Sequence, residues 1–214
     1  MADRDDDVAG VLADERPSTQ MIVPLMKRSE PGDGIRPARQ TASFTTDSGQ
    51  PRTIQLRRSE EFVVEDFVGD LLITYVFDLP RFFRHVNRKD CLDFGIRHDE
   101  LRALSVRNLV RSRPKPEIRP GRAGVMLVLD ENLESSLLLV DHLWDQFEPQ
   151  LPGETIAAVP ARDTILITGT EVPDGIELLE RAIDTVWERS EQRLQLSRSV
   201  LVRRSKSWHV FDRS

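Results

Sequence analysis

GVMLVLDENLESSLLLVDHLWDQF, residues 124–147, decides the fold predicted for this chain. Residues 125–129 form a short apolar run of β-forming residues, which indicates a buried strand. Asp130 and Asn132 then offer helix caps, and acidic residues follow where a helix N-terminus favours them. The apolar residues after them recur at helical spacing: Leu133, Leu137, Val140, Trp144 and Phe147. We therefore predict one helix over 131–147, with an exposed acidic face. That face comprises Glu134, Asp141, Asp145 and Glu148.

The chain after this segment repeats the order of strands and helix. TIAAVP at 155–160 and TILITG at 164–169 predict a β-hairpin. A second amphipathic helix is predicted over 174–190, where Asp174 and Glu177 have capping-box spacing. SVLVRR and WHVF predict a final hairpin.

The chain before it shows a similar order. MIVPLM at 21–26 carries a proline that restricts it to an edge strand. LLITYVF at 71–77 predicts a strand with which residues 82–86 pair, and a helix is expected over 98–112. The side chains expected to face inward from that helix are Leu101, Leu104, Leu109 and Val110. Residues 43–56 form at most a weak hairpin.

These units predict an α+β fold, in which an antiparallel sheet of successive strand-strand-helix units has helices on one face. Residues 1–18 are acidic with little to bury, so we expect a solvated N-terminal arm. Residues 19–214 are expected to form a single α+β domain. A division into sub-lobes 19–122 and 123–214 is the alternative.

Composition narrows the class of protein. The chain has 214 residues, a net charge of −6 and a single cysteine, Cys91. It has no apolar run of the roughly 20 residues that a membrane span requires, and its N-terminus is not typical of a signal peptide. We expect a cytoplasmic protein without a membrane segment.

The order of motifs resembles the YtpQ-like family of bacterial proteins, whose function is unknown. The resemblance rests on IVPLMKRS at 22–29, DLLITYVFDLP at 70–80, Asn108 with Leu109, MLVLDENLESSLLLVDHLW at 126–144 and AVPARDTILI at 158–167. It covers most of residues 20–211 and implies a bacterial cytoplasmic protein with an α+β fold. It implies no reaction.

Candidate ligand-binding residues lie at the start of the central helix. Ser135 and Ser136 would lie in the first turns of the helix, where backbone N–H groups can bind an anion. Asn132 before them and Asp163 in a hairpin turn are the other candidates. The alternative, which we favour, is that these small serines let the helix pack closely against the sheet.

Other chemistry lacks support in the sequence. Cys91 lies near His85 and His98, but the neighbouring Asp90 disfavours a reactive thiolate. The histidines are scattered, so no metal ligand set is predicted. We assign no catalytic residue and no cofactor.

Charge is distributed unevenly along the chain. Residues 97–122 contain eight basic and three acidic residues, whereas 130–188 contain fourteen acidic and two basic ones. Six arginines form the predicted interaction patch: Arg102, Arg107, Arg111, Arg113, Arg119 and Arg122. Such a surface can steer a charged partner, or the two regions can neutralise each other.

We therefore predict a non-catalytic interaction or adaptor module that contacts another protein. A hydrolase-like enzyme with its site at the start of helix 131–147 is one alternative. A nucleic-acid binder that uses the arginines of 97–122 is the other, although no aromatic residues alternate with them.

Overall fold

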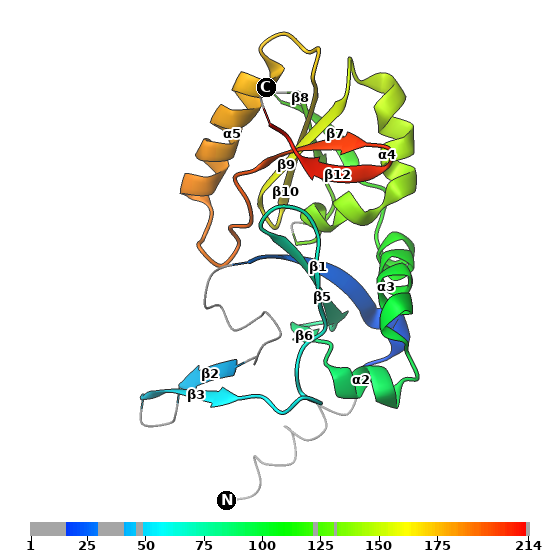
Figure 1. The fold of residues 1–214 in the computed structure, drawn as a ribbon, viewed down its shortest axis with the longest axis vertical. Helices are drawn as coiled ribbons and strands as arrows, with labels where there is room; N and C mark the ends of the chain where they lie inside the picture. Colours follow the sequence, from blue (N-terminus) through cyan, green and yellow to red (C-terminus); the bar gives the residue numbers. More distant parts are fainter. Residues whose placement is uncertain (1–15, 30–40, 46–48, 122–123, 131, 213–214) are drawn as a thin grey trace, which may run out of the picture.

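The computed structural model describes residues 16–29, 41–45, 49–121, 124–130 and 132–212. They form two larger antiparallel sheets and a separate hairpin, β2 (Thr41–Thr45) with β3 (Pro51–Gln55). Helices accompany both sheets (Figure 1). The predicted α+β fold with antiparallel strands is confirmed. Most of the predicted acidic arm lies outside the described residues.

The first sheet is organised around β5 (Leu71–Asp78). It pairs with β1 (Ile22–Arg28) on one side, and with β4 (Val64–Asp66) and β6 (Phe83–His85) on the other. Ile22 faces Phe77 and Arg28 faces Leu71 in the antiparallel register of β1 and β5. β1 is therefore an edge strand, as the proline inside it predicts. The short 3-10 helix η1 (Thr19–Met21) precedes it.

Two helices follow this sheet. Cys91 lies buried in α2 (Arg88–Asp93). α3 (His98–Ser112) has the predicted bounds and packs against β1. Asn108 fixes that packing, because its side-chain amide donates to the carbonyls of Thr19 and Ile22 at 2.8 and 2.9 Å. Val110 was expected to face inward, but 44% of it is exposed.

The second sheet has six strands in the order β12-β11-β9-β10-β8-β7. β9 (Thr155–Ala161) and β10 (Thr164–Gly169) form the predicted hairpin, and β11 (Val200–Arg204) and β12 (Ser207–Val210) form the final one. β7 (Glu117–Gly121) is the exposed edge strand beside β8 (Gly124–Val128).

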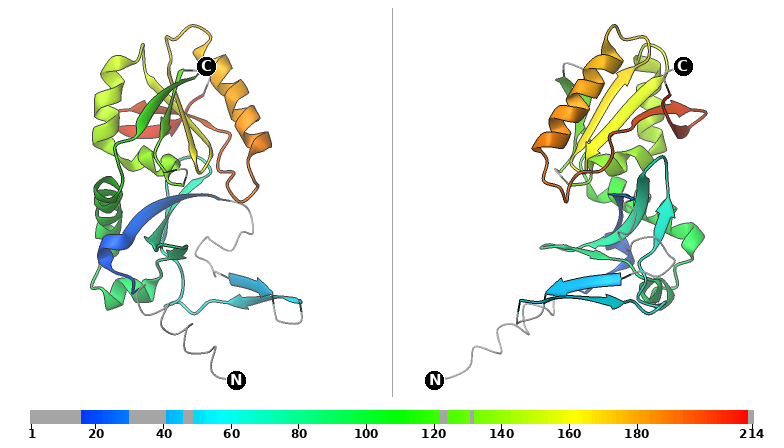
Figure 2. Two further views of the ribbon diagram at one scale, coloured as in Figure 1. Left: turned by 180° about the vertical axis from the view of Figure 1, so that it is seen from behind. Right: turned by 60° about the vertical axis from the view of Figure 1, so that its left-hand side comes forward.

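Helices cover both faces of this second sheet rather than one. α5 (Gly175–Arg189) packs Leu179 and Ile183 on Ile156, Ala158 and Val202. The intervening strand residues, including Ala157 and Leu201, belong to the main core with Trp144 of α4 (Asp141–Phe147). Figure 2 shows α5 and α4 on opposite sides of the strands. Successive residues of a strand point to opposite faces of the sheet, so each face packs against its own helix.

The central segment differs most from its prediction. The helix expected over 131–147 is two pieces: the 3-10 helix η2 (Glu134–Leu139), then α4, followed by the 3-10 helix η3 (Glu148–Gln150). Val140 separates them with φ −95° and ψ 78°, which is not helical. The break lets η2 lie between β1 and β10 while α4 covers the six-stranded sheet. Glu131 lies outside the described residues.

Two smaller predictions of local structure are also wrong. Glu134 was placed on an exposed face, but it is 1% exposed, and its carboxylate accepts hydrogen bonds from the amides of Leu129 and Asp130. α5 begins as expected, yet Asp174 adopts a left-handed φ of 54° and its side chain makes no capping bond.

One main core joins the two larger sheets. It contains residues of β1 and β5, such as Leu25 and Phe77, together with Leu127 of β8 and Trp144 of α4. Within the described part of the chain, none of the helices has the length and apolar character needed to cross a bilayer.

Candidate functional site

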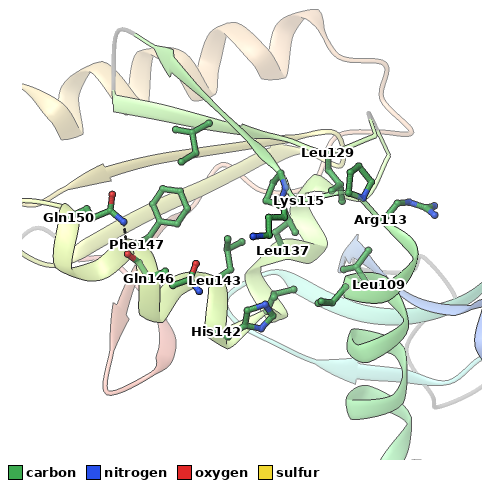
Figure 3. Close-up of a pocket in the computed structure, with 15 residues that line it drawn as sticks. Leu109, Arg113, Lys115, Leu129, Leu137, His142, Leu143, Gln146, Phe147 and Gln150 are labelled. Carbon is green, nitrogen blue, oxygen red and sulfur yellow. Dashed lines mark hydrogen bonds between the residues drawn. The ribbon is translucent and has the colours of Figure 1, made fainter.

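A hollow of about 370 Å³ lies between the end of α3, β7 and α4. Its walls are largely apolar and include Leu109, Leu129, Leu137, Leu143 and Phe147. Figure 3 shows Leu109 approaching from α3, and Leu143 and Phe147 from α4. Gln150 donates to the carbonyl of Gln146 at 2.7 Å along the same wall. The first hollow therefore has few polar side chains, and most of its surface is apolar.

A second hollow, of about 550 Å³, lies beside the first. Val110 and His142 line both, so they form the ridge between the two. Thr19, Gln20 and Leu104 contribute to the second hollow from η1 and α3. We call the two hollows together the α3–α4 groove.

The α3–α4 groove is basic, although the protein as a whole is acidic. None of its lining residues is an aspartate or a glutamate. The cationic side chains along it are Arg107, Arg111, Arg113 and Lys115. Arg107, Arg111 and Lys115 would therefore attract an acidic ligand, whereas Arg113 is already paired with Asp78 and Asp130.

Apolar side chains are also exposed at the groove. Val110 on the ridge is 44% exposed, and Ile118 of β7 at its edge is 56% exposed. Large apolar residues that are exposed together beside a concavity are typical of binding surfaces.

The predicted arginine patch is only partly available. Arg102 pairs with Glu65 at 2.6 Å, and Arg119 pairs with Glu117 at 2.9 Å. Arg113 pairs with both Asp78 and Asp130, each at 2.5 Å. Arg107 makes no ion pair with the described residues, and Arg111 contacts only Gln20 and Asn108 by hydrogen bonds there. Arg122 lies outside the described residues.

The two candidate serines are buried where η2 meets the sheets. Ser135 and Ser136 are both 0% exposed. The Ser136 hydroxyl donates to the carbonyl of Pro24 at 2.9 Å, and the Ser135 amide donates to the carbonyl of Arg162 at 3.1 Å. Neither serine lines the hollows described here. Their small size lets η2 pack closely, which agrees with the structural interpretation of these residues.

Asn132 and Asp163 lie apart from the serine hydroxyls. Asn132 lines a third, polar hollow of about 320 Å³, together with Asp78, Phe83, Asp130 and Arg162. Its side-chain carbonyl lies 3.5 Å from Nη2 of Arg162. Asp163 follows Arg162 in the turn, and its carboxylate accepts from the Thr164 hydroxyl at 3.2 Å. The structure therefore brings the candidate polar residues toward Arg162.

The geometry argues against a reactive Cys91 thiolate and shows no metal ligand set among the described residues. Cys91 is buried, and burial together with the Asp90 carboxylate raises the pKa of its thiol, which opposes thiolate formation. Among the residues with described positions, no three histidine, cysteine or acidic side chains gather as metal ligands would.

Sequence reasoning missed a buried charge that holds α4 to the second sheet. The side chain of Arg203 in β11 is 0% exposed, and Glu148, Asp141 and Asp145 surround it at 2.5, 3.4 and 3.4 Å. Three of the four residues of the predicted acidic face therefore hold this arginine. Only the alternation of β11, which turns Arg203 toward α4, could have indicated it.

Comparison with known proteins gives distant bacterial relatives. The chain is 23% identical over 125 residues to a UPF0354 protein of Listeria innocua, covering 58% of this chain and 47% of the relative. It is 22% identical over 121 residues to a UPF0354 protein of Staphylococcus aureus, covering 55% and 42%. The chain thus spans less than half the length of these relatives, which represent an uncharacterised bacterial family. No family model and no solved structure matches it.

Proposed function

We propose that this protein is a non-catalytic interaction or adaptor module, and that the α3–α4 groove binds a partner protein through an acidic, amphipathic segment. The single observation that carries this proposal is an apolar groove whose lining has no carboxylate and has three basic residues, Arg107, Arg111 and Lys115, that make no ion pair in the described structure.

The apolar part of the groove supplies the driving force. Val110 and Ile118 remain substantially exposed, and burying them under apolar partner side chains removes that surface from water. Each fully buried aliphatic side chain contributes about 1.5–3 kcal/mol. Two hollows side by side suit successive anchor residues on one face of a helix.

The charge of the groove selects the partner. Arg107, Arg111, Arg113 and Lys115 lie along it, and Arg107 is unpaired within the described structure. Figure 3 shows Lys115 beside Leu137 in the first hollow, whereas Arg113 points away from it. A glutamate-rich segment would gain attraction on approach, and a lysine-rich one would be repelled.

The test uses two fluorescein-labelled synthetic peptides of about 18 residues. Both carry leucines at helical spacing, and the remaining positions are mainly glutamate in one peptide and lysine in the other. We expect fluorescence anisotropy to show saturable binding of the acidic peptide and weaker binding of the basic one.

Val110→Asp tests the location of that binding. It places a carboxylate on the ridge, so we expect affinity for the acidic peptide to fall at least about tenfold, or 1.4 kcal/mol. Val210→Asp is the matched control, because Val210 is 47% exposed on β12 outside the groove. Equal binding by the two variants, or equal binding of the two peptides to the unmodified protein, would contradict the proposal.

The alternatives receive less support from the geometry. The buried serines give the hydrolase-like alternative no accessible hydroxyl at η2. Ion pairs occupy Arg102, Arg113 and Arg119, which lowers the charge that the nucleic-acid alternative requires. Within this proposal, the chain is a cytoplasmic, YtpQ-like protein, which is consistent with its one buried cysteine.

A further inference from the structure

Three basic side chains converge between the two larger sheets, away from the α3–α4 groove. Lys27 comes from β1, His85 from β6, and Arg162 from the turn between β9 and β10. The register pairs Lys27 with Leu72 and His85 with Val76, so these two side chains share one face of the first sheet. The guanidinium of Arg162 lies over Phe83 on β6, 5.9 Å from the ring centre.

No carboxylate lies within ion-pair distance of this basic cluster in the described part of the chain, although the charges of Asp163 and Asp130 act on Arg162. None of its three members makes an ion pair there, and Nε of Arg162 and Nδ1 of His85 are buried without a hydrogen-bond partner. The nearest carboxylates have other contacts, because Asp130 holds Arg113 and Asp163 accepts from Thr164. Buried Arg203, by contrast, is surrounded by three carboxylates.

Mutual repulsion is visible in the acid–base properties of the cluster. Burial and the Arg162 charge lower the pKa of Lys27, and burial and the Lys27 charge lower the pKa of His85 to about 4. Burial and Arg193 lower the pKa of Arg162. Partly buried cations without a partner are costly, so a bound anion would relieve all three residues together.

Space for an anion exists beside this cluster. The polar hollow of about 320 Å³ is lined by Arg162, Asn132, Arg81 and Arg113, and by the carboxylates of Asp78 and Asp130, both of which pair with Arg113. The side-chain carbonyl of Asn132 lies 3.5 Å from Nη2 of Arg162, and its amide group donates to the carbonyl of Asp130 at 3.2 Å, which leaves one N–H of that group as a further donor. Arginine is well suited to this role, because its planar fork matches the oxygens of a carboxylate or a phosphate.

We propose that Arg162, with Asn132 in the hollow and Lys27 behind it, binds the oxyanion group of a small molecule, a carboxylate or a phosphate. Arg162 provides the directed hydrogen bonds and Lys27 adds charge. Arg113 lines both this hollow and the first hollow of the α3–α4 groove. The groups proposed to bind the anion, Arg162, Asn132 and Lys27, do not line the groove, so either proposal can fail without the other.

The test is isothermal titration calorimetry of the full chain with sodium phosphate and with sodium malonate, at ionic strength fixed with sodium chloride. We expect saturable binding of at least one anion. Stronger binding of phosphate indicates a phosphorylated ligand, and stronger binding of malonate indicates a carboxylate. Heat no greater than that of a matched chloride injection for both anions would overturn the proposal.

Arg162→Gln should weaken binding at least tenfold. Arg181→Gln is the matched control, because Arg181 is an exposed arginine on α5. Arg162→Lys keeps the charge but removes the fork, so it should retain part of the affinity if Arg162→Gln fails to fold. Equal affinity in Arg162→Gln and Arg181→Gln would contradict the assignment.

NMR titration of His85 in the folded protein reports on the charge of the cluster directly. A bound anion next to the cluster should raise the pKa of His85 from about 4. The saturating anion should produce this shift in the unmodified protein and in Arg181→Gln, but not in Arg162→Gln. An unchanged His85 pKa in the presence of saturating anion would place that anion elsewhere and overturn the site.

Discussion

Arg203 is the residue on which the packing of α4 against β11 depends most directly. Its side chain is fully buried, while the three carboxylates around it, Asp141, Asp145 and Glu148, keep 72%, 38% and 37% of their side chains exposed. Removing the arginine would leave the carboxylates partly solvated but close together. The loss in the free energy of unfolding should therefore be smaller than the ~3–5 kcal/mol that is typical when one partner of a fully buried ion pair is removed.

We predict that Arg203→Met lowers the free energy of unfolding by about 2 kcal/mol. Urea denaturation at neutral pH, followed by circular dichroism, measures it. Arg204→Met is the control, because Arg204 pairs with Glu154 at the exposed surface and should contribute little. A similar loss in both variants would show that burial of Arg203 is not the cause.

His85 makes a separate prediction about pH. Its pKa is lowered to about 4 in the folded protein, mainly by burial and also by Lys27, from an ordinary value of 6.5. Between these values the unfolded chain binds the proton more readily than the folded one. The contribution of neutral His85 is therefore complete above pH 6.5 and is lost as the pH falls toward 4.

From pH 7 to 4.5 this loss is about 2 kcal/mol. Replacing His85 by Phe, which can still stack near Phe62, should reduce the pH dependence by that amount. Urea denaturation of the two proteins at both pH values measures the difference. Exposed His98 is the control, so a His98→Gln protein should follow the unmodified one. An unchanged slope in His85→Phe would refute this prediction.

At this scale the sequence could identify polar residues but not their surroundings. It placed Asn132 and Asp163 together as candidates, and both lie next to Arg162, which was not selected. A lone arginine in a hairpin turn resembles any surface arginine. Its burial depends on β6 and β1, which are distant in the sequence.

At the scale of the element, the central segment shows why periodicity alone is insufficient. Apolar spacing over 131–147 fits one helix, but η2 must fill the space between β1 and β10 before α4 turns onto the second sheet. Tertiary packing overrides helix propensity here. β5 and β9, which are buried on both faces and read as continuous apolar runs, and α3 follow the predicted bounds closely.

Two tryptophans satisfy the carbonyls at the end of η2. The indole of Trp144 donates to Leu137 at 2.8 Å, and that of Trp208 donates to Leu138 at 3.0 Å. Their rings meet edge to face with centres 4.8 Å apart. Together they stabilise the break at Val140, where a continuous helix would have satisfied these carbonyls itself.

We predict that Trp144→Phe and Trp208→Phe each destabilise the protein by about 2–4 kcal/mol, from the lost bond and the cavity. Differential scanning fluorimetry and chemical denaturation measure this effect. Trp187→Phe is the control, since Trp187 is half-buried and contacts Arg28 and Arg198 with its ring. Equal stability of all three variants would mean that these indole bonds do not hold the break.

At the scale of the whole molecule, the order of strands and helices was predictable, but their division between two sheets was not. Local patterns specify hairpins such as β9–β10, whereas nothing local indicates that β1 joins β5 rather than β9. The α3–α4 groove is a product of that assembly. Its walls come from α3, β7 and α4, so no single stretch of sequence could reveal it.

Methyl NMR with the acidic peptide is the sharpest test of whether the α3–α4 groove binds an acidic, amphipathic segment. We predict that the methyl signals of Val110, Ile118 and Leu143 move saturably, while those of Val210 and exposed Leu92, outside the groove, stay fixed. Shifts confined to Val210 or Leu92, or no shifts at millimolar peptide, would contradict the claim.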